Sequence, residues 1–286
     1  MSSGTRWIIG TYAVAVNASG ETAVERPRAA AFFDLDKTVI AKSSALAFGR
    51  TFLRNGLINR RAALRSAYAQ FVFAASGADA EQVERMRAHL TEMCTGWDVR
   101  QVRAIVEETL HDIVDPLVYA EATELIAEHA TEGRDVVVVS ASGAEIVSPI
   151  STMVGATHSM GTRMVAADGR YTGEIEFYCY GRNKATAIRE LAAERGYDLA
   201  ASHAYSDSIT DLPMLEAVGH PTVVNPDRGL RSLALERGWP ILEFSKPVSL
   251  RSRIRVPLGT AAAVTAIGLG AVATAGAWYR LRRRGR

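Results

Sequence analysis

The chain has 286 residues and a formal net charge of +2, and this length allows one α/β domain with an inserted part and extra terminal sequence. Eight arginines and no acidic residue lie in residues 251–286, which leaves residues 1–250 with 25 basic and 31 acidic side chains. Because this main part lacks the basic footprint of nucleic-acid-binding proteins, we expect no nucleic-acid partner.

Residues 1–28 are predicted to be a leader that is extended or poorly ordered. Residues 7–16 are apolar, follow Arg6 and precede the run Asn17-Ala18-Ser19-Gly20. The hydrophobic region of a secretory signal could show the same pattern. We favour the leader, and therefore place the domain that follows it in the cytoplasm.

The first predicted strand, residues 29–33, consists of three alanines and two phenylalanines. Continuous apolar sequence is typical of a parallel strand buried on both faces. Asp34 and Asp36 would then lie at the carboxyl edge of the sheet, where open α/β folds bind ligands. Asp34 could attack phosphorus and form an aspartyl-phosphate, while Asp36 transfers the proton. A simple acidic turn is the alternative, because Asp is common in turns.

A helical insertion is predicted next, because roughly 95 residues separate this strand from the following one, far more than an ordinary connection. Residues 81–90 and 99–109 carry apolar side chains three and four positions apart, as helices do. We assign residues 41–118 to a helical cap that closes over the site and supplies substrate contacts. The alternative is a separate helical domain without a lid role.

The second strand is expected at the four valines of residues 136–139, and Ser140 follows where it ends. The Ser140 hydroxyl could donate to a phosphate oxygen, and the turn at Ser142 and Gly143 could add backbone N–H groups from a helix start. Ser140 could also be only a helix cap.

A helix with its first turn at Lys184 is predicted to end at Gly196. A cation in a first turn lies at the unfavourable end of the helix dipole, and a bound anion would offset that cost. Exposed lysines in first turns are nevertheless common, so Lys184 could also be an ordinary surface residue.

A third strand near residues 204–206 precedes two acids, Asp207 and Asp211, and a helix that Pro213 starts. Carboxylates of this kind suit Mg²⁺, which usually takes one or two of them plus substrate phosphate and water. Asp207 is the better placed ligand. Asp211 is either a further ligand, a support for one, or a helix cap.

Together and in this order, the fragments resemble the haloacid dehalogenase-like hydrolase superfamily, subfamily IB, which contains phosphoserine phosphatases. The resemblance covers roughly residues 29–243. It implies an α/β fold, a Rossmann-like doubly wound parallel sheet, with the cap inserted into a core of residues 29–40 and 119–244.

The resemblance also implies roles for the candidate site residues. Asp34 would be the nucleophile and Asp36 the general acid and base. The remaining roles are phosphate binding by Thr38, Ser140, Ala141 and Lys184, and Mg²⁺ binding by Asp34, Asp36 and Asp207, with Asp211 as a ligand or behind one.

The implied reaction is hydrolysis of a phosphate monoester, because superfamily members that cleave carbon–halogen bonds lack an acid equivalent to Asp36. Phosphoserine phosphatases carry a Glu at the position of Ser43, where it receives the serine ammonium, and Ser43 supplies no such charge. Their Ser-Gly-Gly is also changed here, to Ser140-Ala141-Ser142. We therefore expect a broader or different substrate, and keep a phosphotransferase and a non-catalytic, membrane-tethered scaffold as alternatives.

The C-terminal part predicts a membrane anchor. Residues 256–279 contain no charge in 24 positions and are long enough to cross a bilayer, with Trp278 and Tyr279 as interfacial anchors. A basic linker, residues 245–255, precedes the span, and a basic tail, residues 280–286, follows it. An amphipathic or buried helix is the alternative.

The anchor carries three further expectations. It predicts a single-pass membrane protein, and it suggests a lipid-derived phosphate monoester as an alternative to a small-molecule one. Small residues four apart would allow two such helices to pack closely, which suggests a homodimer. The residues of this pattern are Ala262, Ala266, Gly270 and Thr274.

Overall fold

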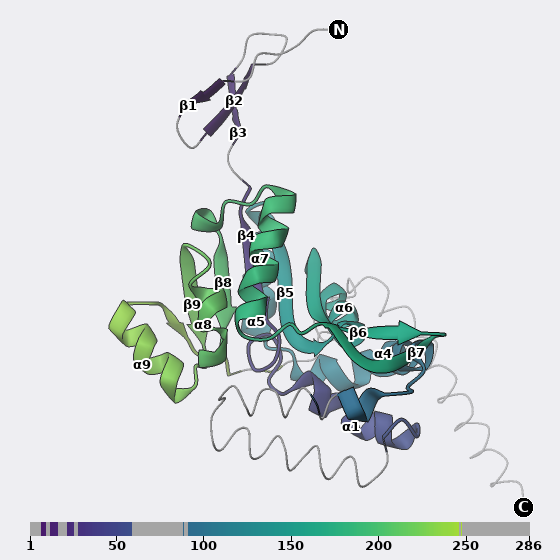
Figure 1. Ribbon diagram of the computed structural model, residues 1–286. Coiled ribbons are helices and arrows are strands. Elements are labelled where there is room, and N and C mark those ends of the chain that lie inside the picture. The colour runs from purple at the N-terminus through teal and green to yellow at the C-terminus, as the bar shows by residue number, and fades with distance from the viewer. Residues whose placement is uncertain are drawn as a thin grey trace, which may run out of the picture. The chain divides into compact units, whose positions relative to one another are not determined.

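A seven-stranded sheet with the order β10-β9-β8-β4-β5-β6-β7 organises the fold (Figure 1). Every neighbouring pair is parallel except β6 and β7, which are antiparallel. The predicted α/β parallel sheet is therefore confirmed. Its strands are β4 (Ala30–Asp34), β5 (Asp135–Gly143), β6 (His158–Ala167), β7 (Arg170–Phe177), β8 (His203–Ser206), β9 (His220–Val224) and β10 (Ile241–Leu242).

The computed structural model describes residues 28–58, 88, 91–245 and 247, and the backbone of residues 7–9, 12–16 and 22–25. The described helices lie in the connections between these strands. They are α1 (Ser44–Arg54), α4 (Val99–Val114), α5 (Ala120–Thr131), α6 (Ala144–Met153), α7 (Arg182–Arg195), α8 (Leu212–Leu215) and α9 (Arg228–Arg237), with short 3₁₀ helices at Asp115–Leu117, Leu199–Ala201 and Ile209–Asp211.

Helices cover both faces of the sheet, because the central strands are apolar on both. In β4, Phe32 belongs to a core cluster that includes Ile188 of α7 and Leu230 of α9. Phe33 points to the opposite face, where its ring stacks on Tyr205 at 4.4 Å and meets the edge of His129 from α5. Both phenylalanines are at most 1% exposed, as expected of a strand buried on two sides.

The N-terminal segment, predicted to be an extended or poorly ordered leader, contains three strands. Strands β1 (Trp7–Ile9), β2 (Tyr12–Val16) and β3 (Thr22–Glu25) form an antiparallel sheet in the order β1-β2-β3. The same apolar run that resembles a leader also has the β-branched and aromatic residues that favour strands.

Two of the described α-helices between β4 and β5, α1 and α4, lie within residues 41–118, where the sequence predicts the cap. Helix α4 begins at Asp98, whose carboxylate accepts hydrogen bonds from Arg100 N at 2.9 Å and Gln101 N at 3.1 Å. It covers the helical pattern at residues 99–109 and continues to Val114. The limits of the cap, residues 41–118, stay a prediction.

No helix within the described ranges is long and apolar enough to cross a membrane. The predicted span, residues 256–279, and the basic tail, residues 280–286, lie outside those ranges.

A buried histidine connects α5 to β8 on the face opposite α7. His129 Nδ1 lies 2.9 Å from Arg134 Nη1, and its Nε2 lies 2.8 Å from the Tyr205 hydroxyl. Since arginine can only donate, Nδ1 is the acceptor and the ring is neutral. Burial, followed by His203 and Arg134, lowers the pKa of His129 to about 4.

This arrangement predicts acid destabilisation. The unfolded histidine titrates near its usual 6.5, above the folded value, so protons bind the unfolded chain preferentially and stability is lost as the pH falls from about 6.5 towards 4. We expect the free energy of unfolding to drop by about 1–2 kcal/mol between pH 7 and pH 5 on account of His129. Urea unfolding at both pH values should show a smaller drop for His129→Gln than for the unmodified chain. An equal drop in both proteins would contradict the assignment.

Candidate active site

The carboxyl ends of β4, β5 and β8 bring the predicted site residues to one edge of the sheet. The register pairs Asp34 with Val139 on one side of β4 and Phe33 with Tyr205 on the other. Asp34 therefore lies beside the first residues that follow β5 and β8. This is the edge at which open α/β sheets bind ligands.

Lys184 lies at the centre of this edge and is only 2% exposed. Its Nζ donates to Asp34 Oδ1 at 2.5 Å and to Asp211 Oδ2 at 2.8 Å. Helix α7 starts after Gly181, whose φ of 53° is left-handed, so Lys184 falls in the first turn as predicted. The two carboxylates offset the unfavourable position of this cation on the helix dipole.

The four carboxylates at this edge outnumber the one buried cation there, Lys184. They belong to Asp34, Asp36, Asp207 and Asp211. Burial raises the pKa of Asp34 well above its ordinary value, and Asp211, Asp207 and Asp36 raise it further against the opposing effect of Lys184. Burial likewise raises the pKa of Asp207 to about 7. For Lys184, burial acts to lower the pKa, but Asp211 and Asp34 raise it on balance. The site therefore has negative charge in excess.

Asp211 holds Lys184 rather than capping a helix. It occupies the N-cap position of α8 but makes no side-chain cap hydrogen bond there. Its Oδ2 accepts from both Lys184 Nζ and the Ser206 hydroxyl, the latter at 2.7 Å. Of the alternatives that the sequence left open, the geometry favours a supporting position for Asp211.

Asp207 lies in a loop that is fixed from outside the site. Its carbonyl oxygen accepts from Asp227 N at 2.7 Å, and the Asp227 carboxylate accepts from Ile209 N at 2.8 Å and from Leu230 N at 2.8 Å. The exposed Lys37 approaches the Asp207 carboxylate at 3.9 Å. Asp227 therefore links the loop to the start of α9.

Asp36 faces the start of the cap. Its Oδ1 accepts from Ser44 N at 2.9 Å, at the start of α1, and the Ser44 hydroxyl lies 2.7 Å from that of Ser142. Burial raises the pKa of Asp36, against the effect of the hydrogen bonds from Ser44. A carboxyl group with a raised pKa at the core–cap boundary is suited to exchange a proton.

The predicted phosphate-binding residues divide into two groups. Ser140 and Ala141 line the cavity at the sheet edge, and the Ser140 hydroxyl accepts from Ser142 N at 3.2 Å. Lys184 lines it as well. Thr38 does not line the cavity: it is fully buried, and its hydroxyl has no hydrogen-bond partner in the part of the chain that the structure describes.

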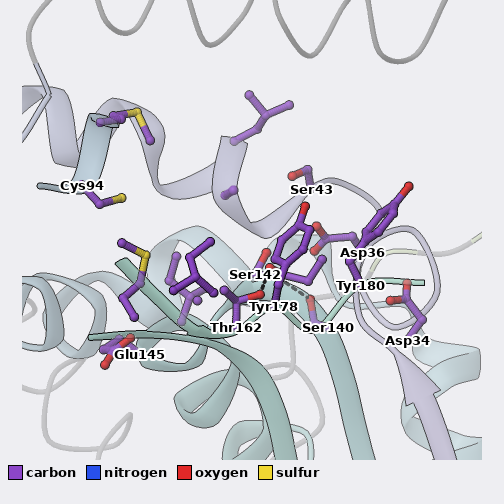
Figure 2. Close-up of a pocket in the computed structure, with 18 of the residues that line it drawn as sticks. Asp34, Asp36, Ser43, Cys94, Ser140, Ser142, Glu145, Thr162, Tyr178 and Tyr180 are labelled. Carbon is purple, nitrogen blue, oxygen red and sulfur yellow. Dashed lines mark hydrogen bonds between the residues drawn. The ribbon is translucent and has the colours of Figure 1, made fainter. Parts of the chain in front are cut away.

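The edge opens into a cavity of about 720 Å³ between the core and the cap helices. Figure 2 shows Asp34, Asp36 and Tyr180 at one end of the drawn side chains, and Cys94 and Glu145 at the other. Residues that are far apart in sequence therefore line one cavity, with Asp34 and Asp36 at one end of it.

The donors fit a divalent cation of the Mg²⁺ type. Among residues 28–58 and 91–245, no group of three or more His, Cys, Asp or Glu side chains is arranged to hold a metal by itself. Mg²⁺ needs only one or two carboxylates and takes its other ligands from water and phosphate. Asp34 and Asp207, whose pKa values are raised by burial among like charges, match that requirement.

Sequence reasoning missed two supporting residues, Ser206 and the carboxylate of Asp227. Ser206 ends β8 one position before Asp207, so its place at a strand end was the available signal. Asp227 caps α9 in a pattern that sequence can predict. Its bond to Ile209 has no local sequence signal.

Comparison with known proteins identifies the family. The model of the haloacid dehalogenase-like hydrolase family matches residues 31–216. The protein named "Probable phosphatase Rv3661" of Mycobacterium tuberculosis (strain ATCC 25618 / H37Rv) is 66% identical over 260 residues, covering 91% of each chain. "Phosphoserine phosphatase SerB1" of the same strain is 35% identical over 260 residues, covering 90% of this chain and 82% of that one.

A solved structure agrees with this relationship. A protein of unknown function from Bordetella pertussis Tohama I has a TM-score of 0.67 and 29% identity, over 76% of this chain and 99% of that chain. The chain thus belongs to the haloacid dehalogenase-like hydrolases and is similar to phosphoserine phosphatases within them. It is a phosphoric monoester hydrolase rather than a non-catalytic scaffold.

Removing the buried cation should destabilise the fold. Lys184→Met leaves two buried carboxylates without their cation, and we expect the free energy of unfolding to fall by about 3–5 kcal/mol without added metal. Arg195→Met removes a cation from the exposed end of the same helix and should change it by less than about 0.5 kcal/mol. Urea unfolding measures both, and equal losses would contradict a central role for Lys184.

Removing the external support of the Asp207 loop should reduce both stability and activity. In Asp227→Ala, the N–H groups of Ile209 and Leu230 lose their acceptor, and we expect a loss of about 2 kcal/mol. Phosphatase kcat/KM should fall on the order of tenfold or more, because the loop positions Asp207. Asp198→Ala removes a cap of a 3₁₀ helix without touching this loop, and should lose stability but not kcat/KM. A normal kcat/KM for Asp227→Ala would contradict the positioning role.

Proposed function

We propose that the protein is a Mg²⁺-dependent phosphatase that cleaves a phosphate monoester through an aspartyl-phosphate on Asp34. The observation that carries this proposal is the buried contact of Lys184 with Asp34 and Asp211, beside Asp36 and Asp207. Phosphoryl transfer requires mainly positioning and neutralisation of charge, and these groups are placed for both.

In the first step, a carboxylate oxygen of Asp34 attacks the phosphorus in line with the leaving oxygen. The new O–P bond forms as the bond to the alcohol breaks, and the carboxyl group of Asp36 gives its proton to the departing alcohol oxygen. Lys184 neutralises the phosphoryl oxygens, while the Ser140 hydroxyl and the backbone at Ala141 bind them. Burial of Asp36 keeps its proton available at a higher pH than usual.

In the second step, the Asp36 carboxylate takes a proton from a water molecule, whose oxygen attacks the phosphorus. The bond between phosphorus and Asp34 breaks, inorganic phosphate leaves, and both aspartates return to their starting state. An acid and base positioned in this way typically contributes on the order of 10² to 10⁴ in rate.

Mg²⁺, when bound, supplies the positive charge that the site lacks and orients the phosphoryl oxygens. Asp34 and Asp207 would hold it through their carboxylates, while Asp211 keeps Lys184 in place behind them. Asp36, the third predicted ligand, would take part through its main-chain oxygen, because its carboxyl group transfers the proton. Thr38 is not among the residues that line the cavity, so its predicted contact with phosphate belongs to the proposal alone.

A small-molecule phosphate monoester is the proposed substrate class, which the similarity to a phosphoserine phosphatase supports. The cytoplasmic location stays a prediction from the leader, residues 1–28, while the lipid-derived alternative, the single-pass anchor and the homodimer all depend on residues 256–279. They stay predictions, because that segment lies outside the described residues.

The test is phosphate release by the full chain, with and without Mg²⁺, from a panel of monoesters. Asp34→Asn should lower kcat by at least about 10³, because its amide cannot form the covalent intermediate. Asp168→Asn is the matched control, since Asp168 is exposed in the β6–β7 turn with a φ of 50° that Asn tolerates.

Asp168→Asn should keep full activity. Metal-independent release, or full activity of Asp34→Asn, would contradict the proposal. Adding glycerol as a second acceptor separates the phosphotransferase alternative: a transferase would form glycerol phosphate in place of inorganic phosphate.

A further inference from the structure

The cavity continues from the carboxylates into a compartment with an apolar wall. One side is formed by α1, α4 and residues 93–97, and the other by β6, β7 and the start of α6. We call this region the apolar compartment. Its lining side chains are Phe52, Ile58, Met93, Trp97, Val102, Ile146, Met164 and Ile175.

The wall of the apolar compartment is tied together by backbone hydrogen bonds between cap and sheet. Gly96 N donates to Tyr171 O at 2.8 Å, and Tyr171 N donates to Trp97 O at 3.0 Å. The Trp97 ring meets the edge of Phe52 at 5.6 Å. These bonds extend the β6–β7 hairpin into the cap and hold Trp97 over the cavity.

Gly173 shows how closely the two sides approach. A Cβ at this position would lie 2.3 Å from the Thr95 hydroxyl, and its φ of 93° favours glycine. Strand β7 and the cap therefore pack directly against each other in this wall.

Charge is confined to the two ends of the cavity. Apart from the cluster at the sheet edge and Lys37 beside it, Glu145 is the one charged side chain among the described lining residues. Ser43, next to the carboxylates, is neutral. A substrate that carries an ammonium and a carboxylate near its phosphate would gain no matching charge from Ser43 or from the apolar wall.

Building on the proposed function, we propose that the leaving group is an alcohol with an apolar body, alkyl or aromatic, that fills the apolar compartment. Leu46 supports this: it lines the cavity and is 52% exposed, although its side chain is large and apolar. The cavity, at about 720 Å³, has the size of sites that bind ligands much larger than serine.

Glu145 does not indicate a cationic leaving group, because its carboxylate already interacts with other side chains of the protein. Arg103 Nη2 lies 3.5 Å from Glu145 Oε1. Burial, followed by the charge of Glu145 and a hydrogen bond to it, raises the pKa of the Tyr171 hydroxyl, which therefore stays a donor. An amine at this end of a substrate would have to displace Arg103.

The experiment measures kcat/KM of the full chain with Mg²⁺ for five esters: ethyl, hexyl, 2-phenylethyl and 6-aminohexyl phosphate, and phosphoserine. Each methylene that leaves water contributes roughly a factor of four, so hexyl phosphate should exceed ethyl phosphate by at least about 30-fold. Hexyl and 2-phenylethyl phosphate distinguish an alkyl from an aromatic body. Both should be better substrates than phosphoserine.

Two variants test the wall itself. Trp97→Ala should lower the ratio of hexyl to ethyl kcat/KM about tenfold. Ile175→Thr keeps a β-branched strand residue, so it should fold, and it should lower the same ratio several-fold. Trp239→Ala, which changes a tryptophan that packs against the core cluster and does not line this cavity, is the matched control and should not change the ratio.

The outcomes separate the two proposals. Equal or better turnover of ethyl phosphate or phosphoserine would overturn the apolar leaving group and leave the phosphatase mechanism intact. A preference for 6-aminohexyl over hexyl phosphate would also overturn it, in favour of a cationic group at Glu145. No Mg²⁺-dependent release from any ester by folded protein would contradict the proposed function itself.

Discussion

The contact of Lys184 with Asp34 and Asp211 is the constraint on which the site depends. Each of these side chains comes from a different element: Asp34 ends β4, Lys184 begins α7 and Asp211 precedes α8. Burying any one of them alone would cost several kcal/mol, so they are stable only together. The pairing of β4 with β8 and the left-handed turn at Gly181 are therefore conditions for the site as well as features of the fold.

The same constraint explains why the polar and apolar parts of the cavity are separate. At the sheet edge, Lys184 is shared by Asp34 and Asp211, and Asp211 also accepts from the Ser206 hydroxyl. The opposite wall is formed by the β6–β7 hairpin and the loop before α4, which meet through main-chain bonds and so leave apolar side chains free to line the cavity. The proposed reaction therefore takes place on core residues, and the proposed choice of leaving group depends on residues where core and cap meet.

Sequence could predict the parts of this arrangement that have local signals. The valines of β5, the acids after β4 and β8, and the end of α7 at Gly196 each follow from neighbouring residues. Sequence could not decide the position of Asp211, because an acid four residues after Asp207 suits a ligand, a cap or a support equally. The apolar compartment had no signal at all, since Trp97 and Ile175 meet only through the fold. The strands at residues 7–9, 12–16 and 22–25 were covered only by the expectation of an extended or poorly ordered leader, because an apolar leader has a similar composition.

The charge balance at the sheet edge gives the strongest physical reason to expect a divalent cation. Asp34, Asp36, Asp207 and Asp211 face one buried lysine, and the lysine is already shared by two of them. A phosphate ester brings further negative charge into this space, and at such short distances the repulsion would exceed what the exposed Lys37 offers. Burial is the largest cause of the raised pKa values of Asp34 and Asp207, and neighbouring carboxylates add to it. In the proposed mechanism, protonating Asp34 would remove the nucleophile, so neutralisation would have to come from a cation that leaves it ionised, and oxygen donors of this kind favour Mg²⁺.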